Sequence, residues 1–128
     1  MYNQIMDKKN ILLVEDDEFI RDIFKEILES EKYVVSIASD GGQALEQLKN
    51  GTWDLVLLDV MMPVMTGIEV IQKIRAEKIP VNYKKLIFLT NIDDGKEIAE
   101  LIALGDGYFM KSDLTPPSLV EKVNSILA

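Results

Sequence analysis

Side chains that can bind a metal ion or a phosphoryl group stand directly after the short apolar runs of this sequence. They are acids, a hydroxyl and an amine: Glu15, Asp16, Asp59, Thr90 and Lys111. Carboxylates that meet within a few Å repel one another strongly at low effective dielectric, so a site that gathers these acids requires a cation. Oxygen ligands that leave room for water and phosphate oxygens suit Mg²⁺ better than a full Ca²⁺ cage. We therefore predict that this chain binds Mg²⁺.

The same side chains suit phosphoryl transfer. Asp59 would attack phosphorus in line, while the metal ion and Lys111 neutralise charge on the equatorial oxygens. Thr90 adds a hydroxyl donor, and the product would be an aspartyl phosphate. Other reactive groups are excluded, because a chain with 0 His and 0 Cys has no Ser-His-Asp triad, thiolate nucleophile, disulfide or usual structural zinc site.

Short apolar runs alternate with segments of helical period, and these elements must position the reactive side chains. The runs predict strands over residues 11–14, 34–39, 55–58, 86–89 and 108–110. The first helix is amphipathic, and capping signals mark the starts of the others: Asp40 with Gln43, Thr66 with Glu69, Asp94 with Glu97, and Thr115 with Pro116.

This alternation predicts an α/β fold of the (βα)5 type. Strands that are apolar throughout and separated by helices indicate a doubly wound parallel five-stranded sheet inside a three-layer sandwich. In the flavodoxin-like order 2-1-3-4-5, the first and third strands are neighbours. Glu15, Asp16 and Asp59 would then converge on one pocket at the carboxyl ends of those strands.

Length and charge narrow the function further. The 128 residues fit one domain, for which we expect residues 10–128, preceded by an N-terminal extension over residues 1–9. The 22 acidic and 14 basic residues give a net charge of −8, which argues against a nucleic-acid surface. The sequence has neither an apolar stretch long enough for a membrane span nor a signal peptide, so a cytoplasmic location is expected.

Separated motifs in the sequence resemble a known family. They are Leu-Leu-Val-Glu-Asp-Asp at 12–17, Asp-Val-Met-Met-Pro-Val-Met-Thr-Gly at 59–67, Leu-Thr at 89–90, and Tyr108 three residues before Lys111. In this order they resemble the receiver domain of bacterial two-component response regulators, of the single-domain, chemotaxis-like kind. The resemblance covers nearly the whole chain.

The resemblance implies that Asp59 is the phosphoacceptor and that a partner histidine kinase or histidine phosphotransfer protein supplies the phosphoryl group. Glu15, Asp16 and Asp59 would hold Mg²⁺, helped by the main-chain carbonyl of Met61. Since this chain has no histidine, the histidine of the relay must belong to the partner.

The resemblance also implies a switch. Thr90 and Lys111 would bind the phosphoryl oxygens, and Tyr108 would move inward as Thr90 is drawn to the phosphate. The surface of the fourth helix, fifth strand and fifth helix would change as a result. That face would bind a downstream target protein or a second copy of the chain.

Some positions depart from the family pattern. The residue after the switch threonine is usually small but is Asn91 here, and the residue after the active lysine is usually a cis proline but is Ser112 here. These changes leave the shape of the fifth loop open. The residues two positions after the phosphoacceptor and the switch threonine, Met61 and Ile92, are apolar. Neither can orient water, so we predict slow self-dephosphorylation.

Two other functions stay open. One is an Mg²⁺-dependent aspartyl-phosphate phosphatase of the haloacid dehalogenase type, although Met61 stands where such enzymes place their general acid. The other is a degenerate receiver that acts as a docking module. We favour a phosphorylation switch that is not a turnover enzyme, either stand-alone or as the receiver of a longer regulator or hybrid kinase. The last helix runs to Leu127, and we expect no DNA-binding segment.

Overall fold

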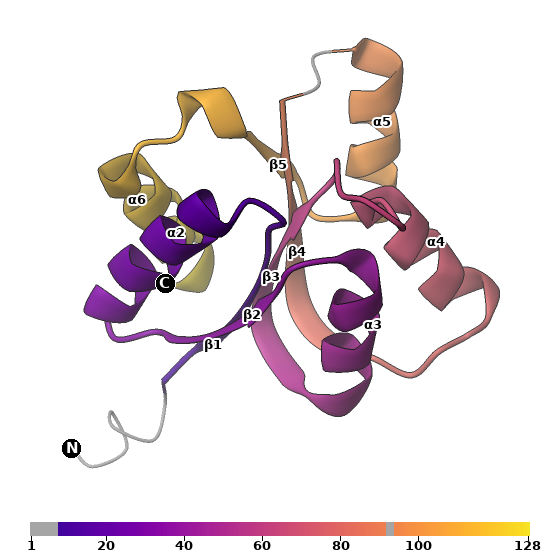
Figure 1. Ribbon diagram of the computed structural model, residues 1–128, viewed down its shortest axis with the longest axis horizontal. Coiled ribbons are helices and arrows are strands. Elements are labelled where there is room, and N and C mark those ends of the chain that lie inside the picture. The colour runs from indigo at the N-terminus through magenta and orange to yellow at the C-terminus, as the bar shows by residue number, and fades with distance from the viewer. Residues whose placement is uncertain (1–7, 92–93) are drawn as a thin grey trace.

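A five-stranded parallel sheet lies at the centre of the protein in a computed structural model, which describes residues 8–91 and 94–128 (Figure 1). The strand order is β2-β1-β3-β4-β5, as predicted. The strands are β1 (Asn10–Val14), β2 (Val34–Ala38), β3 (Thr52–Asp59), β4 (Asn82–Thr90) and β5 (Tyr108–Met110). Residues 1–7 of the predicted N-terminal extension, and Ile92, lie outside the described residues.

Helices cover both faces of the sheet. They are α2 (Glu18–Ser30), α3 (Gly41–Asn50), α4 (Gly67–Ala76), α5 (Gly95–Leu104) and α6 (Pro116–Leu127), with a short 3₁₀ helix, η1 (Lys111–Asp113), after β5. Helices α2 and α6 lie on one face, and α3, α4 and α5 lie on the other (Figure 1). The predicted flavodoxin-like three-layer sandwich is confirmed. None of the described helices is long and apolar enough to cross a membrane.

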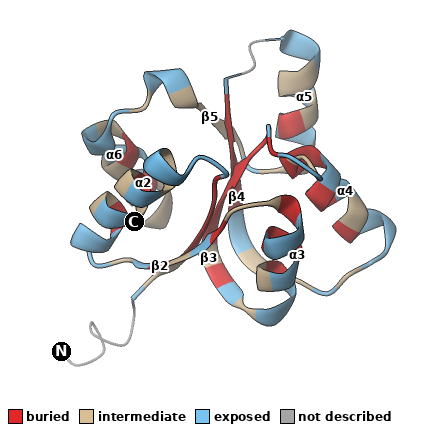
Figure 2. Ribbon diagram, viewed as in Figure 1, coloured by how far each residue is buried: buried red, intermediate tan, exposed pale blue. Residues whose placement is uncertain are grey.

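Successive strand residues alternate between the two faces of the sheet, and both faces are buried (Figure 2). Residues facing α3, α4 and α5 include Leu12, Val14, Val56, Leu58, Leu86 and Phe88. Residues facing α2 and α6 include Ile11, Leu13, Leu55, Leu57, Ile87 and Leu89. Each fully buried side chain of this size contributes about 1.5 to 3 kcal/mol. These two cores fix the strands, and with them the side chains at the carboxyl ends.

Strands β3 and β4 begin earlier than the apolar runs indicated. Their ladder starts at Thr52 opposite Asn82 and includes Trp53 opposite Tyr83. The first positions of both strands are polar or half-exposed, so a search for continuous apolar residues misses them. Trp53 itself is buried, and its indole N–H donates to the carbonyl of Gln47 at 3.2 Å.

The predicted helix caps are present, but not every capping box is complete. Thr66 and Glu69 bond each other's backbone N–H groups and form a full box. Asp40 caps α3, whereas the Gln43 side chain accepts from the backbone N–H of Ser39 rather than from Asp40. The Asp94 side chain caps α5 by accepting from the backbone N–H of Lys96 at 2.8 Å, and not from the backbone N–H of Glu97. A single cap satisfies enough orphan donors to start each helix.

Candidate functional site

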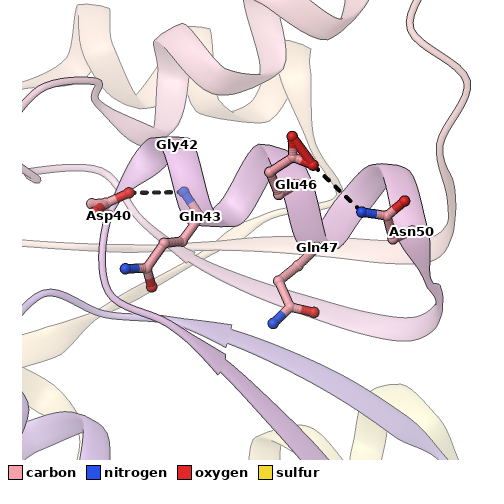
Figure 3. Close-up of a pocket in the computed structure, with 6 residues that line it drawn as sticks. All are labelled: Asp40, Gly42, Gln43, Glu46, Gln47 and Asn50. Carbon is pink, nitrogen blue, oxygen red and sulfur yellow. Dashed lines mark hydrogen bonds between the residues drawn. The ribbon is translucent and has the colours of Figure 1, made fainter.

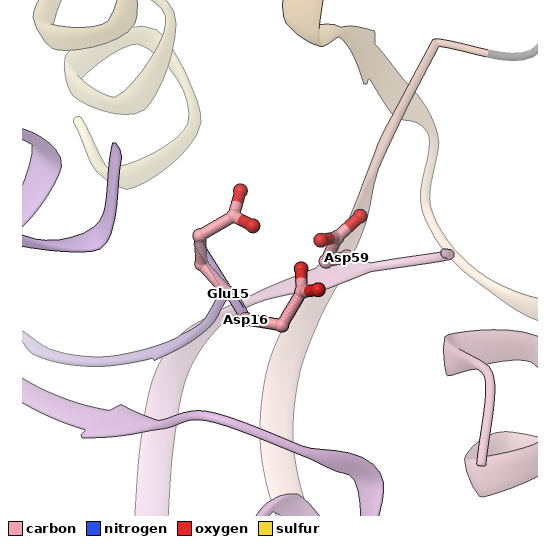
Figure 4. Close-up of side chains that lie close together, drawn as sticks. All are labelled: Glu15, Asp16 and Asp59. Carbon is pink, nitrogen blue, oxygen red and sulfur yellow. The ribbon is translucent and has the colours of Figure 1, made fainter. Parts of the chain in front are cut away.

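Three acids meet at the carboxyl ends of β1 and β3. Glu15 and Asp16 directly follow β1, and Asp59 is the last residue of β3. The parallel register pairs Val14 with Leu58, so the residues that follow them, Glu15 and Asp59, lie opposite each other. One carboxylate oxygen from each acid lies within 4.8 Å of the others (Figure 4). The structure thus brings together the acids that the sequence placed in one pocket.

The acids differ in their access to solvent. Glu15 is 0% exposed and Asp59 is 1% exposed, whereas Asp16 is exposed. The cluster therefore has two buried acids, with the exposed acid, Asp16, at its mouth.

Neighbouring groups hold Glu15 in place. Arg21 of α2 donates from Nη1 to the main-chain carbonyl of Glu15 at 3.1 Å, and the backbone N–H of Asp17 donates to Oε2 of Glu15 at 3.2 Å. Asp17 is also the N-cap of α2. Arg21 was not singled out from the sequence, because a basic residue in the first turns of an amphipathic helix is usually a solvated one.

Lys111 provides the positive charge nearest to the acids. Its ammonium lies 2.8 Å from Oε1 of Glu15 and 3.3 Å from Oδ2 of Asp59. Since Lys111 follows β5 and Asp59 ends β3, the side chain crosses the end of β4 to reach them. One ammonium next to three carboxylates leaves the site with excess negative charge.

Burial and the neighbouring acids change the proton affinity of the site. Loss of solvent, followed by hydrogen bonding and charge from Glu15 and hydrogen bonding from Asp16, raises the pKa of Asp59 to about 8, although Lys111 acts against this. Burial raises the pKa of Asp16, but hydrogen bonds with Asp59 and Glu15 outweigh it and leave the pKa lowered. Burial lowers the pKa of Lys111, and its contacts with Glu15 and Asp59 reverse this to a net increase. In the absence of a cation, Asp59 therefore holds a proton at neutral pH.

Thr90 and Met61 flank Asp59 from different sides. Thr90 ends β4 and is 1% exposed, and the neighbouring β3–β4 ladder pairs Asp59 with Leu89. Met61 lies in the loop between β3 and α4, and its side chain is 63% exposed. The side chain of Met61 is therefore largely in solvent.

Tyr108 lies at the start of β5, opposite Phe88 of β4. Its side chain is half-buried and packs against the core beneath α3, α4 and α5. Its role as a switch residue stays a prediction.

Gly67 is a site residue whose role the sequence did not reveal. It is the first residue of α4, and a Cβ atom at this position would lie 2.4 Å from the main-chain oxygen of Asp59. Its N–H donates to the carbonyl of Val60 at 2.9 Å. Only glycine permits this close approach, so Gly67 fixes how α4 packs against the end of β3. In the sequence, the signal for this role was the glycine that ends the motif at residues 59–67.

A surface hollow of the described chain lies away from the acidic cluster. It is a shallow groove along the exposed side of α3, lined by Asp40, Gly42, Gln43, Glu46, Gln47 and Asn50 (Figure 3). Asp40 uses its carboxylate to cap the helix, and Asn50 donates to Glu46 at 3.4 Å. The groove gathers no set of metal ligands, so the acidic cluster remains the candidate site.

Known proteins resemble this chain in sequence over nearly its full length. Residues 11–124 match the family described as the response regulator receiver domain. The chemotaxis protein CheY of Halobacterium salinarum is 32% identical over 120 residues, which cover 93% of this chain and 97% of that protein. The transcriptional regulatory protein YrkP of Bacillus subtilis is 45% identical over 103 residues, which cover 79% of this chain and 42% of YrkP. This chain also spans 50% of the response regulator SaeR of Staphylococcus aureus.

Solved structures agree. The response regulator TrrA of Thermotoga maritima, in complex with Mg(2+)-BeF, is 35% identical, with a TM-score of 0.76 over 93% of this chain and 99% of that one. A CheY-like receiver domain protein of Methanospirillum hungatei is 34% identical, with a TM-score of 0.80 over 94% of both chains. Family match, fold and an acidic cluster at the strand ends agree: this chain belongs to the response regulator receiver domain family, the signalling modules of two-component systems.

Proposed function

We propose that this receiver domain accepts a phosphoryl group on Asp59 from a partner histidine kinase or histidine phosphotransfer protein. The observation that carries the proposal is the convergence of Glu15, Asp16 and Asp59 within 4.8 Å, with Lys111 in contact with two of them. The site gathers three carboxyl groups around one ammonium, which is more acids than an ion pair needs, and keeping two of them buried is costly. A site that gathers charge in this way suits a cation and a phosphoryl group.

The donor set fits Mg²⁺. It consists of carboxylate oxygens, with no nitrogen or sulfur ligand, and the pKa of Asp59 is raised first by burial and then by the neighbouring acids, whose charge a cation would offset. We assign the ion to Glu15, Asp16, Asp59 and the main-chain carbonyl of Met61. When bound, Mg²⁺ would neutralise charge on the phosphoryl oxygens.

The side chains of the site then have separate tasks. An Oδ atom of Asp59 attacks phosphorus in line and forms the new P–O bond, while the P–N bond to the donor imidazole breaks and the imidazole leaves with the bonding electrons. Lys111 stabilises negative charge on the equatorial oxygens from the β5 side. Thr90 donates its hydroxyl to one of these oxygens.

Switching follows from the place of Thr90 and Tyr108 on adjacent strands. Movement of Thr90 toward the phosphoryl group would free space for the Tyr108 ring and change the surface formed by α5, β5 and α6. That surface would bind the downstream target protein or a second copy of the chain. Residues 10–128 would make up this switching domain, which acts once per phosphorylation and not as a turnover enzyme.

Intact mass spectrometry tests the proposal. The chain is incubated with Mg²⁺ and acetyl phosphate, and then with a cognate kinase, in parallel with the Asp59→Asn variant. We expect one phosphoryl group on the wild type and none on the variant or in excess chelator. If neither donor modifies the wild type, the chain is a docking module. Continuous phosphate release from a phosphomonoester would instead make it a phosphatase.

A further inference from the structure

A side-chain hydrogen bond joins the loops that follow β4 and β5. Oδ1 of Asn91 accepts from the backbone N–H of Ser112, with the N and O atoms 2.8 Å apart. The backbone ladder between these strands ends at Thr90 opposite Met110. The Asn91 bond therefore continues the connection between the strands beyond the last ladder pair.

The partner of Asn91 is a donor that its own helix leaves unsatisfied. Ser112 is the second residue of η1, and Met110, which precedes this helix, supplies no side-chain cap. The first N–H groups of a helix have no acceptor within it. Asn91 thus caps η1 from a neighbouring loop. A proline at position 112 would have no N–H to donate and no use for such a cap.

The capped turn carries Lys111. β5 is a three-residue strand at the edge of the sheet, so few backbone bonds hold the start of this turn. From there the ammonium must reach Glu15 and Asp59, at 2.8 and 3.3 Å. A small rotation of η1 would be enlarged along the lysine side chain and would separate the ammonium from both acids.

We propose that Asn91 is a positioning residue that caps η1 and so aims Lys111 at Asp59. The bond also sets the distance between the loops that carry Thr90 and Lys111, the two groups assigned to the phosphoryl oxygens. Asn91 and Ser112, which both depart from the family pattern, are then explained together, because the side chain of one accepts from the backbone N–H of the other. The effect on phosphoryl transfer rests on the proposed function, whereas the cap itself does not.

Two variants of the full chain separate the cap from other effects. Asn91→Ala removes the acceptor. Ser112→Ala is the matched control, because it removes a hydroxyl but keeps the backbone N–H. Amide hydrogen exchange at residue 112 and the side-chain NMR signals of Lys111 are measured without metal. The rate of phosphorylation by acetyl phosphate is measured with saturating Mg²⁺.

We expect Asn91→Ala to accelerate exchange at Ser112 by about fivefold, which corresponds to one ordinary hydrogen bond. The Hε and Cε signals of Lys111 should shift, and the phosphorylation rate at saturating Mg²⁺ should fall by a similar factor. Ser112→Ala should behave like wild type in every measurement. Asn91→Asp, which keeps an acceptor, should restore protection of the amide.

The proposal is overturned if Asn91→Ala leaves exchange at Ser112 unchanged. It is also overturned if the amide loses protection while the Lys111 signals stay in place. A wild type that takes no phosphoryl group would count against the proposed function alone, because exchange and the Lys111 signals still decide whether Asn91 positions the lysine.

Discussion

At Asp59, a proton and the proposed metal ion would compete for the same carboxylate. The side chain is 1% exposed and has Glu15 and Asp16 beside it, and its pKa rises to about 8. Near neutral pH, the carboxyl group of Asp59 is protonated in the metal-free site, whereas the proposed function needs it as a carboxylate nucleophile. Binding of a cation would release that proton, so phosphoryl acceptance and metal binding should both strengthen as the pH rises.

The raised pKa also makes stability depend on pH. The folded chain holds a proton on Asp59 up to about pH 8, whereas the unfolded chain releases it near 3.8. Between these values the folded state binds more protons, so the free energy of unfolding of the metal-free protein falls as the pH rises. We expect Asp59→Asn to remove this dependence and to stabilise the protein by about 1 to 3 kcal/mol at the upper end of the range.

Urea unfolding in chelator, followed from about pH 5 to about pH 8 for both proteins, measures the effect. Asp22→Asn is the control, since Asp22 is exposed on α2 and is not one of the three clustered acids. A wild-type stability that rises over this range would contradict the assigned pKa of Asp59.

Among the elements, the junction of β3 and α4 has the least freedom. We expect Gly67→Ala to destabilise the protein by about 1 to 3 kcal/mol, because the new methyl group would collide with the main-chain oxygen of Asp59, 2.4 Å away. Phosphorylation should slow as well, since the collision moves Asp59. Thermal unfolding and phosphorylation rates measure both effects.

Gly95→Ala is the matched control for this change. Gly95 begins α5 as Gly67 begins α4, but a Cβ atom at Gly95 meets nothing within 4 Å. Alanine there should stabilise the protein slightly. Equal destabilisation by the two substitutions would mean that contact with Asp59 is not the cause.

The loop that leads to α4 contains a strained residue. Val64 has a φ of 71°, and the N–H of Met65 donates to the carbonyl of Pro63 at 2.8 Å, which makes a γ-turn centred on Val64. A β-branched residue rarely adopts this backbone. Since the Val64 side chain is 94% exposed, it gains little from packing.

We expect Val64→Asn to stabilise the protein by about 0.5 to 1 kcal/mol, because asparagine tolerates positive φ. Denaturant unfolding measures the change. Val34→Asn, at an exposed position in regular strand, is the comparison and should not stabilise. Loss of stability in Val64→Asn would show that the valine makes a contact worth more than the strain.

The sequence predicted elements better than it predicted their details. The apolar runs identified all five strands, because parallel strands with helices on both faces are rich in apolar residues, while the order 2-1-3-4-5 was expected from the flavodoxin-like arrangement. The polar first residues of β3 and β4 were not predicted as strand, because backbone pairing between strands extends beyond the apolar core. Convergence of the acids followed from topology, whereas the bond between Asn91 and Ser112 depends on how two loops fold against each other.

For the whole molecule, ligand binding and stability are linked. The net charge of −8 is mostly spread over helix surfaces, but three of the acids are gathered in one place. We expect Mg²⁺ at about a hundred times its dissociation constant to stabilise the folded chain by about 2.7 kcal/mol, because the unfolded chain has no such site.

Thermal unfolding with and without Mg²⁺ measures this stabilisation, with Na⁺ at equal ionic strength as the control for screening. The shift should be absent in Asp16→Asn. A shift of equal size in that variant would place the ion elsewhere on the acidic surface.

The position of the single tryptophan decides what an optical experiment on this protein reports. Trp53 lies at the amino end of β3 and Asp59 at its carboxyl end, so about 20 Å of strand separates the indole from the acids. Its intrinsic fluorescence should follow loss of the core beside α3. Magnesium titrations and phosphorylation should leave that emission nearly unchanged, and a fluorophore meant to report them belongs near the mouth of the site.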